Sequence, residues 1–122
     1  MPHKVVRAQA EAGMRRLGTD HHDVYFAHIE DRHTPLDDTV ATFASLVTDG
    51  PVRVIGCSNH AAWRIAKARE IARAAGLPGF TCVQQRHTYL RPRPGADFGV
   101  NPHISDELLD YAREEPDLTV LS

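Results

Sequence analysis

This 122-residue sequence has little of what several classes of protein require. Its only cysteines, Cys57 and Cys82, stand in predicted strands, which indicates buried thiols in a reducing cytoplasm rather than a disulfide framework. The net charge is −2, so there is no basic excess to bind nucleic-acid phosphates. No apolar run could span a membrane, and the first residues lack the apolar core of a signal peptide. We therefore expect a cytoplasmic protein that binds neither nucleic acid nor membranes.

Short apolar runs alternate with amphipathic segments along the chain. The apolar runs predict strands at residues 24–29, 52–57, 80–84 and 118–121, and the segments around them have helical periodicity. This alternation implies βαβ units and a parallel sheet. The chain has no glycine-rich GxGxxG fingerprint, which argues against a Rossmann-type dinucleotide fold. We therefore expect an α/β fold: a partial (β/α)8 barrel with about four parallel strands.

The sequence makes four predictions about the helices, three about where they begin or end and one about a charged face. Thr34 is predicted to be an N-cap with Pro35 at the first helical position, and Ser105 is predicted to cap the last helix. Gly76 is predicted to end the third helix. The charged residues of that third helix are predicted to form a solvated outer face. They are Arg64, Lys67, Arg69, Glu70 and Arg73.

Polar residues gather where the predicted strands end. His28 lies near the end of the first predicted strand, Ser58 and Asn59 follow the second, and Gln84 ends the third. In a (β/α)8 barrel these ends form the catalytic face. Purely structural roles also remain open for two of these residues. Asn59 is a good N-cap for the next helix, and His28 could be a hydrogen-bonded core residue.

The eight histidines suggest a metal centre as an alternative. His28, His60 and His87 follow three successive strands, so a metal-dependent hydrolase would place them together. Their spacing matches no ligand motif, and we therefore predict no metal ligands.

Several blocks of this sequence resemble the aldo/keto reductase family. Residues 16–20 read Arg-Leu-Gly-Thr-Asp, and residues 23–28 read Asp-Val-Tyr-Phe-Ala-His. Residues 50–59 read Gly-Pro-Val-Arg-Val-Ile-Gly-Cys-Ser-Asn, and Gln84 follows in the family order. The resemblance implies a (β/α)8 barrel that transfers hydride between NADPH and a small-molecule carbonyl compound or alcohol.

The resemblance also implies roles for four residues. His28 matches the histidine that orients and polarises the substrate carbonyl. Ser58, Asn59 and Gln84 match the residues that hydrogen-bond the nicotinamide carboxamide. These side chains suit that group, because together they offer both donors and acceptors.

The catalytic Asp, Tyr and Lys of the family lie upstream of the matching segment. Residues 1–122 are thus expected to form a partial aldo/keto reductase domain, from about the third helix to the seventh strand, as a truncated gene product or a partial sequence. We expect an oxidoreductase by ancestry that is inactive alone. The alternative is a catalytically dead fragment that acts only through association with another chain. The open sheet edges also predict self-association.

Overall fold

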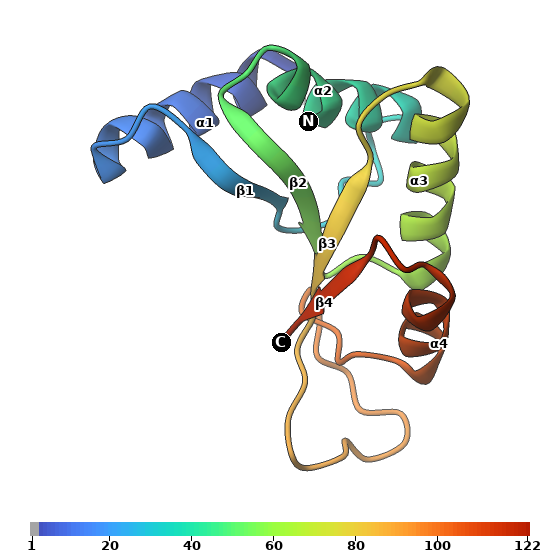
Figure 1. Ribbon diagram of the computed structural model, residues 1–122. Coiled ribbons are helices and arrows are strands. Elements are labelled where there is room, and N and C mark those ends of the chain that lie inside the picture. The colour runs from blue at the N-terminus through green and yellow to red at the C-terminus, as the bar shows by residue number, and fades with distance from the viewer. Residues whose placement is uncertain (1–2) are drawn as a thin grey trace.

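The computed structural model describes residues 3–122 (Figure 1). In chain order its elements are α1 (His3–Leu17), β1 (His22–Ala27), α2 (Leu36–Thr48), β2 (Val52–Ser58), α3 (Ala62–Ala75), β3 (Phe80–Gln84), α4 (Asp106–Glu114) and β4 (Thr119–Leu121). The strands form one sheet in the order β1-β2-β3-β4, and each neighbouring pair is parallel. The prediction of four parallel strands alternating with helices is confirmed. Within residues 3–122, every helix is too short or too polar to cross a membrane.

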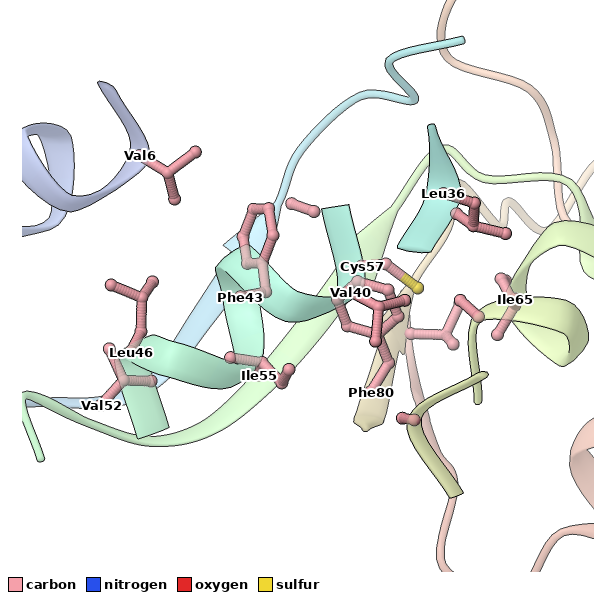
Figure 2. Close-up of a cluster of buried hydrophobic side chains, with 14 of the residues drawn as sticks. Val6, Leu36, Val40, Phe43, Leu46, Val52, Ile55, Cys57, Ile65 and Phe80 are labelled. Atoms are coloured by element: carbon pink, nitrogen blue, oxygen red, sulfur yellow. The ribbon is translucent and has the colours of Figure 1, made fainter. Parts of the chain in front are cut away.

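In the described residues, 3–122, all four helices lie along one side of the curved sheet, and the other side carries none (Figure 1). The core fills the space between these two layers. Phe43 of α2 meets Phe80 of β3 edge to face, with ring centroids 6.0 Å apart. Ile55 and Cys57 of β2 point into the same cluster (Figure 2). Burial of this apolar layer holds the strand ends in place, so the sheet is a rigid support for the residues that follow each strand.

The observed strands differ a little from the predicted ones. β3 has the predicted bounds, and β2 runs one residue further, to Ser58. β1 spans His22–Ala27 instead of residues 24–29, because its pairing with β2 already begins at His22, opposite Val52. His28 therefore follows the strand rather than lying within it.

Two of the three predictions about helix ends are confirmed. The Ser105 hydroxyl accepts a hydrogen bond from the Leu108 N–H at 3.1 Å, as an N-cap does. Gly76 ends α3 in the left-handed conformation, with φ 65°. The prediction for Thr34 is wrong, because α2 begins at Leu36 and its N-cap is Pro35. The Thr34 hydroxyl instead donates to Asp31 Oδ2 at 2.7 Å, which closes the turn before the helix.

The prediction of a fully solvated charged face on α3 is also wrong. Arg69 is only 3% exposed. Its guanidinium donates to Glu115 at 2.8 Å, to Asp117 at 2.7 Å and to the Phe80 carbonyl oxygen. The segment between α4 and β4 supplies both carboxylates and covers this side of α3. A buried charge needs such partners, since desolvation without them is costly.

Candidate functional site

The turn that follows β2 is built around Asn59. Asn59 has φ 58°, a left-handed conformation that asparagine tolerates better than most residues. Its side-chain Nδ2 donates to the carbonyl oxygen of His28 at 2.9 Å and to the hydroxyl of Ser58 at 3.2 Å. This amide group therefore ties the end of β1 to the end of β2.

The four residues predicted from the sequence lie along one edge of the sheet. His28 is exposed directly after β1, and Ser58, only 4% exposed, ends β2. Gln84 ends β3 with an exposed side chain, and its Cα is the register partner of Ser58. Because parallel strands all finish at the same edge, three segments that are distant in sequence become neighbours.

The sequence interpretation missed Gln85, which lies directly after β3 and hydrogen-bonds this turn. Gln85 is 3% exposed. Its Oε1 accepts the backbone N–H of Asn59 at 3.1 Å, and its Nε2 donates to the carbonyl oxygen of Pro102 at 2.9 Å. Its place just beyond a buried strand was the one available signal, but two adjacent glutamines give no indication of which side chain turns inward.

His60 is a structural residue of this turn. Its Nδ1 lies 2.7 Å from the carbonyl oxygen of Ser58 and must carry the proton, since a carbonyl only accepts. The ring is 7% exposed and lies beside Phe80. Burial lowers the pKa of His60, although the bond to Ser58 opposes that shift. His60 is therefore a neutral ring that fixes the Ser58 backbone.

Asn59 does not cap the helix that follows it, so this alternative from the sequence is wrong. The N-cap of α3 is Ala61, which has no side-chain oxygen to offer. The Glu30 carboxylate accepts one hydrogen bond from the Ala61 N–H and another from Arg32 Nε, each at 2.6 Å. Burial alone would raise the pKa of Glu30, but these two donors hold it below the usual value. The Asn59 side chain is thus committed to the strand ends.

The metal-centre alternative finds no support in residues 3–122, where no three His, Cys, Asp or Glu side chains are close enough to hold an ion. His28 is exposed and His60 is buried. His87 lies against His103, with ring centroids 5.7 Å apart. The three histidines follow successive strands, but their side chains take separate environments.

Other reactive side chains are held away from this edge. The Cys57 thiol is fully buried on the helix side of β2, and burial raises its pKa to about 12. Tyr25 lies beside Phe43, with ring centroids 6.3 Å apart, and burial raises its pKa. Neither group is poised to react at the strand ends.

A cavity of about 590 Å³ lies next to the turn. Asn59 and Gln85 line it together with Trp63, Pro102 and His103. None of His28, Ser58 and Gln84 reaches its wall. The cavity and the predicted site thus share only the Asn59 turn.

Comparison with known proteins places this geometry in a family. The model of the aldo/keto reductase family matches residues 1–121. The uncharacterized oxidoreductase YrpG of Bacillus subtilis is 35% identical over 101 residues, which are 83% of this chain and 30% of YrpG. Norsolorinic acid reductase stcV of Emericella nidulans is 38% identical over 82 residues, covering 67% of this chain and 21% of that protein.

A solved structure extends the comparison to the fold. The crystal structure of a protein assigned as a 2,5-diketo-D-gluconic acid reductase B superposes with a TM-score of 0.74 at 21% identity. The match covers 97% of this chain and 36% of that one, so the chain spans about a third of its length. Its alternating parallel strands and helices thus correspond to part of a (β/α)8 barrel, and the chain belongs to the aldo/keto reductase family.

Proposed function

We propose that the strand ends of this chain bind the nicotinamide end of NADPH in an oxidoreductase that reduces an aldehyde or ketone to an alcohol in the cytoplasm. One observation carries the proposal, namely that hydrogen bonds and strand pairing hold all four residues together. Ser58 and Gln84 are register partners, and the Asn59 side chain donates hydrogen bonds to the Ser58 hydroxyl and to the His28 carbonyl oxygen. Family membership and the names of the relatives, an oxidoreductase and a norsolorinic acid reductase, support a reductase.

The residues present fit the nicotinamide carboxamide. That group offers an oxygen acceptor and two N–H donors, and the exposed amide of Gln84 can meet both kinds. The Ser58 hydroxyl accepts from Asn59, and it can still donate its own hydrogen. Held in this way, the ring would present one face to the substrate, and NADPH would supply the hydride.

His28 is the residue proposed to meet the substrate. Its ring is exposed just beyond β1, while its backbone carbonyl is fixed by Asn59. A ring N–H can donate to a carbonyl oxygen, which polarises the carbonyl and stabilises the charge that develops on its oxygen. His28 thus orients the substrate, while the proton must come from another group.

We expect no measurable NADPH-dependent aldehyde reduction by the 122-residue chain tested by itself. The oxygen of the reduced carbonyl needs a proton donor, and loss of one acid–base group lowers rates by about 10²–10⁴. Tyr25 is packed against α2, Tyr111 is on α4 with its pKa raised by burial, and Tyr89 is fully exposed on a loop. None of these phenols belongs to the edge formed by the strand ends.

Titration of the chain with millimolar NADPH, followed by NMR, tests the binding proposal. We expect weak binding, with shifts concentrated at the backbone amide signals of Ser58, Asn59 and Gln84 and at the side-chain amide signals of Asn59 and Gln84. Gln84→Ala should reduce these shifts, and Gln9→Ala on the exposed side of α1 is the matched control. Shifts that avoid the strand ends would contradict the proposal.

The activity expectation needs its own assay. Purified chain is mixed with NADPH and a generic aldehyde, and absorbance of the reduced cofactor is followed. Oxidation of NADPH that disappears in His28→Ala would contradict the expected inactivity. If neither binding nor turnover is seen and another chain co-purifies in fixed stoichiometry, the alternative of a fragment that acts only by association is favoured.

A further inference from the structure

We infer that Gln85 is a positioning residue, which holds the Asn59 turn in the conformation that the nicotinamide site requires. The functional consequence rests on the proposed function, whereas the mechanical part can be tested without any cofactor. Gln85 follows directly after β3, next to Gln84, which is proposed to touch the cofactor itself.

The Asn59 turn needs a partner from outside its own strand. The β2–β3 ladder has its last register pair at Ser58 and Gln84, so the Asn59 N–H lies one residue beyond it. That N–H donates to a side chain, Gln85 Oε1, at 3.1 Å. The left-handed conformation of Asn59, with φ 58°, is unfavourable for a residue with a Cβ. The bond to Gln85 favours this conformation over the extended one.

Hydrogen bonds fix both polar atoms of the Gln85 carboxamide and also the Gln85 backbone. Its Nε2 donates to the Pro102 carbonyl oxygen at 2.9 Å, and its backbone N–H donates to the Leu121 carbonyl oxygen at 3.1 Å. With 3% of its surface exposed, the side chain has little room for another rotamer. Oε1 is thus a fixed acceptor aimed at Asn59.

The two contacts use the carboxamide oxygen as an acceptor and the carboxamide nitrogen as a donor, which makes the role specific to glutamine. Methionine has a similar length but neither bond, while a carboxylate keeps the acceptor for Asn59 and loses the donor for Pro102. Gln85→Met and Gln85→Glu therefore separate the two contacts. Gln9→Met makes the same chemical change at an exposed position of α1 and serves as the matched control.

The first test measures amide hydrogen exchange of Asn59 by NMR in the full 122-residue chain. We expect Gln85→Met to speed exchange at Asn59 about 10-fold, the effect of losing one hydrogen bond, with core amides of β2 nearly unchanged. Gln85→Glu at pH 8 should keep Asn59 protected, and Gln9→Met should change nothing. Unchanged Asn59 protection in Gln85→Met, or an equal loss of protection at every amide, would overturn the inference.

The second test reads the consequence for the cofactor. NADPH titrated into the same variants should bind about 10-fold more weakly to Gln85→Met than to Gln9→Met, with binding partly restored in Gln85→Glu. Equal affinity in Gln85→Met and Gln9→Met would overturn the positioning role. If the wild-type chain shows no shifts at Ser58, Asn59 and Gln84, the proposed function fails, and the exchange experiment still decides whether Gln85 holds the turn.

Discussion

The ring of Phe26 lies where any residue other than glycine at position 56 would place its Cβ. A Cβ built on Gly56 would stand 2.5 Å from Phe26 Cε1 and 3.0 Å from the Cys82 carbonyl oxygen. Gly56 and Phe26 are register partners on β2 and β1, so the glycine makes room for the ring of its neighbour. This is a close-approach role for glycine within a strand.

We expect Gly56→Ala to lower the free energy of unfolding by about 1–3 kcal/mol, because the added methyl group must displace a ring or a backbone carbonyl. Urea denaturation measures the change. Phe26→Ala should lower stability on its own account, but the double variant should lose less than the sum of the two single changes. Strict additivity would show that the two residues do not compete for this space.

Stability should fall as the pH drops below the ordinary histidine value, partly because of His60. Burial is the largest cause of its shift and lowers its pKa below 6.5, so the folded state binds this proton less readily than the unfolded state. The stabilisation by neutral His60 is complete above pH 6.5 and is lost as the pH falls from there through the folded pKa. Urea denaturation between pH 8 and pH 5 measures this dependence.

The variant His60→Gln keeps a donor for the Ser58 carbonyl and does not titrate in this range. Its stability should therefore depend less on pH than that of the wild type, while His33→Gln at an exposed position serves as a control. Identical pH dependence in His60→Gln and the wild type would show that His60 contributes nothing to it.

The two carboxylates that pair with Arg69 should contribute unequally. The Glu115 side chain is 19% exposed and also bonds Arg73, whereas the Asp117 side chain is 63% exposed. We expect Glu115→Ala to cost about 1–3 kcal/mol and Asp117→Ala less than about 1 kcal/mol, since solvent screens the more exposed pair. Thermal or urea unfolding of both variants gives the order, and a larger loss in Asp117→Ala would reverse our interpretation.

The outer strands should make the isolated chain self-associate. β1 and β4 are the outermost strands of the sheet, and they carry Val24, Phe26, Val120 and Leu121. Leu121 is 42% exposed, and an apolar edge strand is a template for pairing with another chain. Size-exclusion chromatography with light scattering should show oligomers that Leu121→Lys diminishes. A sharp monomer peak with cooperative unfolding would contradict this expectation.

The sequence by itself determined the order and nature of the elements. Apolar runs separated by amphipathic segments predicted all four parallel strands, and β3 has the predicted bounds. Ser105 and Gly76 could be assigned because a cap depends on residues within one turn of it. The family blocks likewise predicted roles for His28, Ser58, Asn59 and Gln84, and the structure places each of these residues at or just beyond the end of a strand.

Only the tertiary structure decided which polar groups meet. Arg69 looked like its solvated neighbours, but its partners Glu115 and Asp117 lie 46 and 48 residues further along the chain. Gln85 could not be told from Gln84, because the choice depends on the Asn59 N–H, 26 residues away. Asn59 was expected to cap α3, but the Ala61 N–H at the start of that helix donates to Glu30, which lies 31 residues earlier in the chain. Periodicity and capping are local, whereas burial and pairing of a polar group depend on which segments the parallel sheet brings together.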